Sequence, residues 1–301
     1  MQKGNGNQTT TRLPLPPALK LLRALYPIIE LLIPPLAKKI GIGLFLKPFR
    51  FAAPEREKDV ALKARNTSFG INGQKVEVYH WGNGQRYALC VHGWSGRATQ
   101  FHALIESLLK NGISVIAFDA PAHGKSTGPR TNLIEFAESI KQIIEEHGEP
   151  MVLIGHSLGG IAGMLYQRMH NTSIPQITIN SPAIVDEIFE NYAYRLNARK
   201  EKIAKWIKDY VQAKINKEFY EVSGEYLSKG FPNVPFLICM DEDDREVSMR
   251  NAEVLKQNIP SAEIFTTSTY GHVRILRAEV LALRVMEFVA RLQPVPNEVN
   301  N

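Results

Sequence analysis

Five short, continuously apolar runs stand out along the chain. They are rich in residues that favour strands, and they cover Tyr87–Val91, Ser114–Phe118, Met151–Ile154, Ile177–Ile179 and Phe236–Cys239. Helical stretches at Ala98–Lys110 and Asn132–His147 separate the first three runs. Strands that are buried on both faces of a sheet show such unbroken apolar runs, and alternation with helices is typical of right-handed crossovers. The pattern therefore predicts an α/β fold, with helices on both faces of a mostly parallel sheet.

Residues 67–82 show a different pattern, in which apolar and polar positions alternate around Asn72-Gly73. A tight two-residue hairpin turn needs positive φ at both central positions, and Asn-Gly satisfies this requirement well. We therefore expect an N-terminal antiparallel hairpin that leads into the parallel sheet.

The stretch between Asn180 and Pro235 is too long for a simple crossover, which needs only about a dozen residues. It contains charged helical segments and many aromatic residues. We interpret residues 183–231 as an inserted helical cap, because ligands of open α/β sheets bind beyond the carboxyl ends of the strands. The core then comprises residues 67–182 and 232–293. The alternative is a set of surface helices whose aromatic side chains anchor them to the sheet.

Residues 1–66 form an apolar, basic and helical segment ahead of this core. Residues 1–50 carry eight Lys and Arg and one acid, Glu30, so the rest of the chain is nearly neutral although the formal net charge is +6. This distribution does not favour nucleic-acid binding, and no nucleic-acid motif accompanies it. Charges and prolines also interrupt every apolar stretch before the roughly 18 residues that a membrane-spanning helix needs.

Two interpretations of the N-terminal segment remain. It can form a pair of short helices on the surface of the domain, or residues 12–50 can lie as a basic amphipathic segment on an anionic membrane. Cys90 and Cys239 each lie in an apolar run and are expected to be buried and reduced. Unbridged cysteines favour a cytoplasmic location, with peripheral membrane contact under the second interpretation.

The clearest chemical motif is Gly155-His156-Ser157-Leu158-Gly159, which follows an apolar run and opens a helical stretch. In a strand–turn–helix context, G-x-S-x-G places the serine on a strained turn that leaves little room for neighbouring side chains. The turn exposes the hydroxyl and points the next backbone N–H toward a substrate. We therefore expect Ser157 to be a nucleophile.

On these residues the chain resembles the α/β-hydrolase superfamily over about residues 67–292. Within it the chain is similar to bacterial esterase- and lysophospholipase-like members with a helical lid. The resemblance implies a nucleophile, an acid and a histidine in that order along the chain. His272 follows a β-like run and precedes a helix, so we expect it on a loop from which its imidazole can accept the proton of Ser157.

The resemblance also implies a position for the acid. Members of the superfamily often carry H-G-x-x-D-x-x-V after the strand that corresponds to Phe236–Cys239. Laid on this sequence, the pattern places its aspartate at Asp244 and its valine at Val247, while Met240 and Asp241 replace the His and Gly. Asp244 is therefore the expected acid of the triad, and Asp243 is the alternative.

The resemblance makes His92-Gly93-Trp94-Ser95-Gly96 the oxyanion loop. The expected donors to a developing oxyanion are the backbone N–H groups of Trp94 and Leu158. The alternative role for Trp94 is packing beneath the cap. We expect structural roles for Asp119, Gly124 and His123 in a loop that resembles another motif of the superfamily, and a flanking role for His156. No Cys/His cluster has the spacing of a metal site and no glycine pattern indicates a nucleotide, so no metal or cofactor is expected.

These observations together predict a serine hydrolase that cleaves a small-molecule carboxylic ester, with an acyl or lipid-like ester favoured by the apolar and aromatic segments. The same triad also serves acyltransferases, thioesterases and peptidases, and the pocket decides among them. A non-catalytic ligand-binding member of the fold is the third alternative. The sequence does not indicate an oligomeric state.

Overall fold

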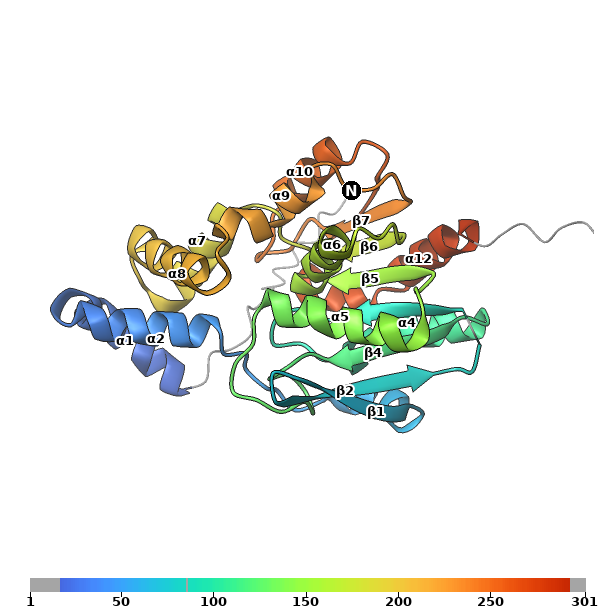
Figure 1. Cartoon of the computed structure of the whole chain (residues 1–301), viewed down its shortest axis with the longest axis horizontal. Coiled ribbons are helices and arrows are strands. Elements are labelled where there is room, and N and C mark those ends of the chain that lie inside the picture. Colours follow the sequence, from blue (N-terminus) through green and yellow to red (C-terminus); the bar gives the residue numbers. More distant parts are fainter. Residues whose placement is uncertain (1–16, 85, 293–301) are drawn as a thin grey trace, which may run out of the picture.

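The computed structural model describes residues 17–84 and 86–292, so residues 1–16 of the predicted N-terminal segment and residue 293 of the predicted core lie outside it. Within this part of the chain, eight strands form one sheet in the order β1-β2-β4-β3-β5-β6-β7-β8 (Figure 1). β1 pairs with β2 and β2 with β4 in antiparallel fashion, and every other pair is parallel. The strands are β1 Arg65–Ile71, β2 Gln74–Trp81, β3 Tyr87–Val91, β4 Ser114–Asp119, β5 Val152–His156, β6 Gln176–Ile179, β7 Phe236–Asp241 and β8 Glu263–Thr267.

The predicted hairpin is confirmed. Asn72 and Gly73 link β1 to β2 with φ of 49° and 76°, which are the positive values that a tight hairpin turn requires. Each of the five predicted apolar runs falls on a strand of the parallel part, except that Met151 lies just before β5, and the buried Cys90 and Cys239 lie unbridged in β3 and β7.

Two hydrophobic clusters cover the two faces of the sheet. Successive residues of a strand point to opposite faces, so Leu89 and Val91 of β3 join one cluster while Ala88 and Cys90 join the other. The first cluster contains side chains of α5 Leu133–His147, α6 Leu158–His170 and α10 Arg250–Asn258. The second contains side chains of α3 Lys58–Leu62, η2 Ala98–Phe101, α4 His102–Lys110, η4 Ile275–Arg277 and α12 Glu279–Arg291. Helices on both faces of the sheet were predicted and are confirmed.

The segment between β6 and β7 forms α7 Val185–Leu196, α8 Lys200–Ile215, η3 Phe219–Val222 and α9 Gly224–Ser228. α7 and α8 share a hydrophobic cluster of their own around Phe189, Ile203 and Ile207. Leu227 of α9 instead joins the cluster around α5 and α6. Within the predicted cap range, α7 and α8 therefore form a layer apart from the sheet, whereas α9 packs with the helices of the core.

The N-terminal residues form α1 Pro17–Leu32 and α2 Pro34–Phe45. α1 continues through Pro27, and the break between the two helices falls at Ile33, just before Pro34 and Pro35. Tyr26 is fully buried and its hydroxyl donates to the carbonyl oxygen of Ala37, which joins the two helices. None of the described helices is both long enough and apolar enough to span a bilayer.

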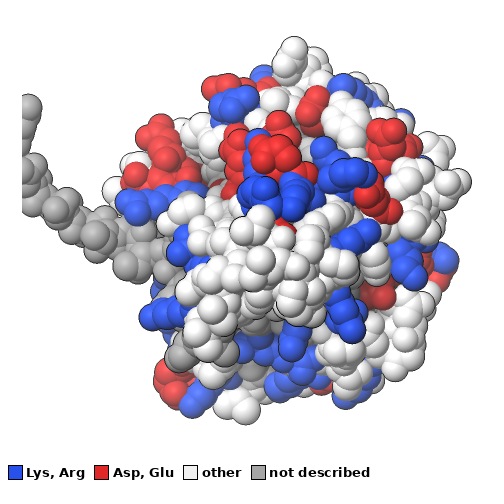
Figure 2. Space-filling model, turned by 90° about the vertical axis from the view of Figure 1, so that its left-hand side faces the viewer, with Lys and Arg blue, Asp and Glu red and all other residues white. Residues whose placement is uncertain are grey.

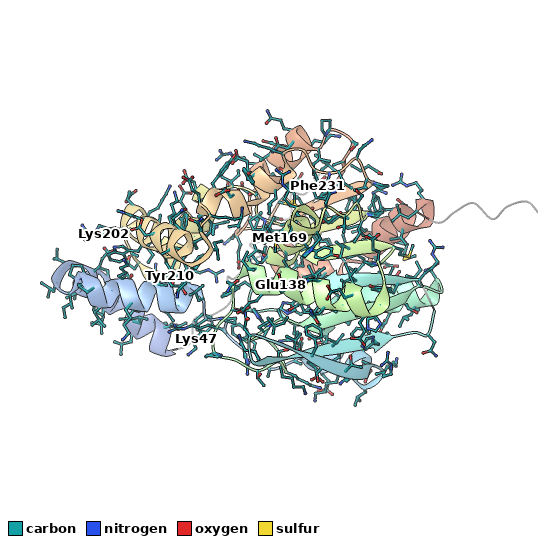
Figure 3. The ribbon with its side chains drawn as sticks, in the orientation of Figure 1. Lys47, Glu138, Met169, Lys202, Tyr210 and Phe231 are labelled. Atoms are coloured by element: carbon teal, nitrogen blue, oxygen red, sulfur yellow. The ribbon has the colours of Figure 1, made fainter. Side chains whose placement is uncertain are left out.

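The two N-terminal helices pack against α7 and α8 (Figure 1). Glu30 of α1 is 2% exposed, and its carboxylate binds the guanidinium of Arg199 at 2.8 Å, at the start of α8. The hydroxyl of Tyr192 in α7 donates to the carbonyl oxygen of Gly41 in α2 at 2.6 Å. Figure 3 shows the side chains of this region, with Lys202 and Tyr210 on α8 and Lys47 just after α2.

A buried ion pair fixes the segment that enters the core. Glu57, at the end of η1 Glu55–Glu57, is 3% exposed and accepts hydrogen bonds from the guanidinium of Arg97 at 2.6 Å and from the hydroxyl of Thr99 at 2.7 Å. If a buried carboxylate loses its partner cation, the attraction of the ion pair no longer offsets the desolvation penalty of the carboxylate.

We therefore expect Arg97→Met to lower the free energy of unfolding by about 3–5 kcal/mol, as measured by urea denaturation. Lys58→Met is the matched control, because Lys58 pairs with Glu55 on the surface at 2.6 Å with both side chains exposed. Such a surface pair contributes about 1 kcal/mol or less. Equal losses in the two variants would contradict the assigned difference in burial.

Candidate active site

Ser157 lies at the turn between β5 and α6, with φ of 51° and ψ of −123°. Positive φ is strained for a residue with a side chain and is maintained only where the surroundings impose it. Here the backbone N–H of Ser157 donates to the carbonyl oxygen of Ile179 at 2.8 Å. A Cβ on Gly155 would overlap the backbone nitrogen of Gly160, and one on Gly159 would overlap the carbonyl oxygen of Val91. The glycines of the motif are therefore required by backbone packing.

The structure brings Ser157, His272 and Asp244 together from three places along the chain. The Nε2 atom of His272 lies 3.1 Å from the Oγ atom of Ser157, and its Nδ1 atom lies 2.7 Å from Oδ2 of Asp244. Ser157 follows β5, Asp244 follows β7 and His272 follows β8, so all three lie beyond carboxyl ends of the parallel strands. Our expectation of a loop at His272 is wrong in detail, because this residue lies in the short helix α11 Gly271–Arg274.

Asp244 is held in one orientation by its own loop. Its second carboxylate oxygen accepts hydrogen bonds from the backbone N–H groups of Glu246 at 2.7 Å and Val247 at 3.1 Å. Asp243, the alternative acid, points elsewhere and accepts a hydrogen bond from the N–H of Thr269 at 2.7 Å. The geometry therefore distinguishes the two neighbouring aspartates, and only Asp244 contacts the imidazole.

The charge state of His272 results from opposing effects. Burial lowers the pKa of the imidazole, but the hydrogen bond to Asp244 and its negative charge outweigh this, so the pKa lies above its ordinary value. The carboxylate of Glu246 lies 4.0 Å from Nε2 of His272 and raises the pKa further, while Arg195 lowers it. Arg195 binds the same Glu246 carboxylate at 2.7 Å. Sequence reasoning missed Glu246, whose only signal was its place two residues after Asp244.

A buried hydrogen-bond network holds the backbone on which His272 stands. Its carbonyl oxygen accepts from Nε2 of His156 at 2.8 Å and from the amide of Asn180 at 3.2 Å. The pKa of His156 is lowered to about 3 by burial and by the neighbouring His272, so this ring is neutral and donates from Nε2. Asp241 accepts from the backbone N–H groups of Gly271 at 2.7 Å and Tyr270 at 3.2 Å. His156 thus supports His272, which agrees with its predicted flanking role.

The loop after β3 lies directly against the serine. A Cβ on Gly93 would lie 2.7 Å from the Cβ of Ser157. The backbone of the next residue, Trp94, therefore begins beside the turn that carries Ser157. The loop is fixed by two buried histidines whose pKa values are lowered by burial. His92 accepts from the N–H of Ala120 at 3.0 Å, and His123 accepts from the N–H of Ser95 at 2.9 Å. These contacts agree with the structural role expected for His123.

Asp119 and Gly124 also have the structural contacts that were expected. The Asp119 carboxylate accepts from the backbone N–H groups of Ala98 and Lys125, each at 2.8 Å, and from the hydroxyl of Tyr79 at 3.0 Å. Gly124 has φ of 43°, and a Cβ there would overlap this carboxylate. Asp119 and Gly124 therefore hold the loop after β4 against the segment that follows Trp94.

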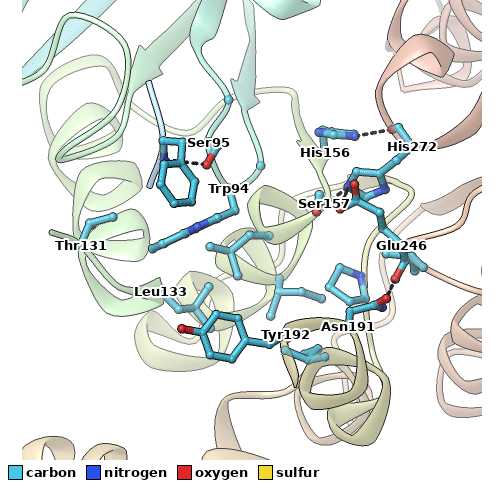
Figure 4. A pocket seen from close by; sticks show the side chains of 18 of the residues that line it. Trp94, Ser95, Thr131, Leu133, His156, Ser157, Asn191, Tyr192, Glu246 and His272 are labelled. Carbon is cyan, nitrogen blue, oxygen red and sulfur yellow. Dashed lines mark hydrogen bonds and ion pairs between the residues drawn. The ribbon is translucent and has the colours of Figure 1, made fainter. Parts of the chain in front are cut away.

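A cavity of about 1010 Å³ opens above the serine and histidine (Figure 4). Trp94 and Leu158 line it from the core, Tyr192 from α7, and Phe45 and Phe49 from the N-terminal segment. Its walls therefore come from three parts of the chain that are distant in sequence. Within residues 17–84 and 86–292, no cluster of three or more Cys, His, Asp or Glu side chains could hold a metal ion.

Comparison with known proteins gives a consistent result. Residues 89–214 match the family model described as the alpha/beta hydrolase fold. The chain is 24% identical to the uncharacterized hydrolase YugF of Bacillus subtilis over 271 residues, which is 73% of this chain and 96% of that protein. The esterase Pf2001 of Pyrococcus furiosus superposes with a TM-score of 0.61 at 21% identity, covering 82% of this chain and 97% of that one.

This chain has the α/β-hydrolase fold. The predicted fold and the predicted enzyme class, a hydrolase, are thereby confirmed. A further relative is the monoacylglycerol lipase of Mycolicibacterium smegmatis, with 23% identity over 133 residues, 40% of this chain and 48% of that protein.

The close backbone packing around Ser157 in this hydrolase can be tested on its glycines. Gly159→Ala places a methyl group against the backbone of Val91, which cannot move away as a side chain can. We expect a loss of about 3 kcal/mol in the free energy of unfolding, the upper end for overpacked sites. Gly70→Ala is the control, because a Cβ there meets no atom within 4 Å. Urea denaturation of both variants measures the difference, and a neutral Gly159→Ala would refute the packing argument.

Proposed function

We propose that this hydrolase cleaves a carboxylic ester through an acyl-enzyme intermediate on Ser157, with His272 as general base and Asp244 as the acid that orients it. The observation that supports the proposal is the continuous chain from the serine hydroxyl through both imidazole nitrogens to a carboxylate, at 3.1 and 2.7 Å. A hydroxyl is a weak nucleophile at neutral pH, and an adjacent imidazole that accepts its proton makes it reactive.

The reaction follows from the protonation states. In the resting enzyme Nδ1 of His272 carries a proton that it donates to Asp244, and Nε2 is free to accept the proton of Ser157. As Oγ attacks the carbonyl carbon, the proton moves to Nε2, and Asp244 stabilises the resulting imidazolium. The imidazolium then protonates the leaving alcohol, and an ester of Ser157 remains. Water activated by the same imidazole releases the carboxylic acid and restores the serine.

The oxyanion donors remain a proposal, for which the backbone N–H groups of Trp94 and Leu158 are the candidates. Leu158 is the first residue of α6, where an N–H has no partner within the helix. In the described part of the chain, no backbone or side-chain atom accepts a hydrogen bond from the backbone N–H of Trp94. Trp94 directly follows Gly93, which packs against Ser157. Two such donors stabilise the charge that develops on the carbonyl oxygen, each by roughly 2.7–4 kcal/mol in comparable enzymes.

The cavity favours an ester with an apolar acyl chain. Phe45, Trp94 and Tyr192 are among its lining residues, and residues 183–222 close it from above, which supports the interpretation of α7 and α8 as a cap. Relatives named as an esterase and a monoacylglycerol lipase support the same substrate class. An acyl ester of a small alcohol is therefore the proposed substrate.

Ser157→Ala should abolish hydrolysis of a p-nitrophenyl acyl ester, with a loss in kcat on the order of 10⁶, because both the nucleophile and its proton transfer are removed. The same variant should no longer be labelled by a fluorophosphonate probe that labels the wild type. Unchanged melting curves would show that the fold is retained. Labelling of the variant, or failure to label the wild type, would reject the proposed nucleophile.

Asp244→Asn should reduce kcat by about 10⁴, whereas Asp243→Asn should change it only a few-fold. The pH profile gives a second readout. His272 must be neutral to accept a proton and its pKa is raised, so wild-type kcat/KM should fall as the pH drops through a value above 6.5. Removing the Asp244 charge leaves the effect of burial dominant, so the acid limb should move to lower pH. A larger effect from Asp243→Asn would transfer the role to that residue.

A further inference from the structure

We propose that the outward side of α1 is a docking surface for an anionic lipid bilayer. The docking surface consists of the exposed apolar residues Leu21, Leu25, Ile28, Leu31, Leu32, Ile33 and Leu36. This interaction goes beyond the ester chemistry and does not depend on it.

α1 is apolar on both of its sides. Tyr26 is buried against Ala37, and Leu22 and Ile29 pack on the same cluster, so one side of the helix faces the protein. Leu21, Leu25, Ile28, Leu31 and Leu32 of the docking surface lie on the opposite side of α1, and Ile33 and Leu36 continue it to the start of α2. All of these residues are between 41% and 71% exposed. It contains half of the large hydrophobic residues that are exposed in the described chain. A contiguous apolar patch of this kind marks an interaction site.

The charge around the docking surface is complementary to an anionic bilayer. Between residues 17 and 54 the sequence holds a single acid, Glu30, and its carboxylate is buried and paired with Arg199. The exposed charged residues of α1 and α2 are therefore basic and include Lys20, Lys38 and Lys39. Figure 2 shows this end of the molecule: uncharged side chains fill the middle of the face, and Lys and Arg side chains gather along its lower edge. An apolar side with basic flanks is the pattern that binds anionic lipid interfaces.

The helices that carry the docking surface also reach the cavity. Leu19 of α1, Leu44 and Phe45 of α2, and Phe49 line the cavity above Ser157. The segment that carries the docking surface is thus also a wall of the pocket, and docking would place the pocket at the lipid interface. The consequence that the substrate is a lipid ester taken from the bilayer rests on the proposed function.

A second copy of the chain is a poorer occupant of the same surface. In a two-fold dimer the same patch meets itself, so the basic residues that flank it would face their own copies. No exposed acid in residues 17–54 offsets this repulsion, whereas anionic headgroups would.

Docking can be tested without catalysis, in the full chain carrying Ser157→Ala. The protein is floated with vesicles of phosphatidylcholine alone or mixed with phosphatidylglycerol, and the bound fraction is measured. We expect binding to the mixed vesicles, weakened at least about tenfold by Leu25→Glu with Ile28→Glu. Lys38→Gln with Lys39→Gln should weaken it roughly thirtyfold, since each lysine near an anionic surface contributes roughly fivefold.

The matched control is Leu62→Glu with Leu283→Glu, two leucines outside the docking surface that are 83% and 58% exposed on α3 and α12. This variant should bind like the parent. All substituted residues are exposed, and melting curves check that each variant folds. Absence of binding to mixed vesicles, or equal losses in the control, would overturn the proposal. The proposal would also be overturned if sedimentation velocity detects a dimer, and if Leu25→Glu with Ile28→Glu dissociates that dimer while vesicle binding persists.

Activity in the otherwise wild-type enzyme separates this inference from the proposed function. Leu25→Glu with Ile28→Glu should leave hydrolysis of a soluble short-chain ester within about twofold, but should reduce hydrolysis of a long-chain ester embedded in mixed vesicles at least about tenfold. Equal effects on both substrates would overturn docking as the cause. If neither ester is hydrolysed in a Ser157-dependent way, the proposed function is rejected. Vesicle binding then still tests the docking surface.

Discussion

The constraint on which the site depends is the turn between β5 and α6. Its backbone comes so close to β3 and to its own helix that no side chain fits at Gly155 or Gly159, and Ser157 adopts positive φ as a result. A residue with a side chain accepts this strain only because the surrounding packing imposes it. The same packing places the Ser157 hydroxyl beyond the end of the sheet and brings Gly93 into contact with the serine. It also leaves the first backbone N–H of α6 without a partner within the helix. The proposed nucleophile and the candidate oxyanion donors are therefore placed by one backbone arrangement.

The opposite side of the site depends on buried polar groups. The carbonyl oxygen of His272 receives hydrogen bonds from His156 and Asn180, while Asp241 binds the backbone of the two residues before it. Displacing the loop would break these buried hydrogen bonds and leave polar groups unpaired, so the bonds hold it in one arrangement. The imidazole can then meet Ser157 and Asp244 at once without the loss of entropy that ordering a mobile loop would require. Asp241 replaces a glycine of the motif common in the superfamily, and this anchoring gives it a physical role.

Burial and local steric demands explain which features could be predicted from the sequence. β3 and the start of β7 match their apolar runs because strands covered on both faces have no polar positions to blur the pattern. Ser157 was predictable because its turn demands glycines at fixed offsets. The sequence indicated Asp244 as the expected acid but left Asp243 as an alternative, because which carboxylate meets the histidine depends on the turn after β7. α11 could not be predicted because it is only four residues long, which is too short to show a helical periodicity. The outward side of α1 could not be distinguished from its buried side because both sides are apolar.

α7 links the pocket walls to the catalytic loop. On one side Tyr192 binds the backbone of α2 at Gly41, and α8 holds α1 through Arg199 and Glu30. On the other side Asn191 donates to the carbonyl oxygen of Glu246 at 2.7 Å, and Arg195 binds the carboxylate of the same residue. Glu246 lies two residues from Asp244 and faces His272. The N-terminal helices and the residues that set the charge state of the imidazole therefore contact the same helix. The contacts of α7 are polar on the side of Glu246, and both polar and apolar on the side of α1 and α2.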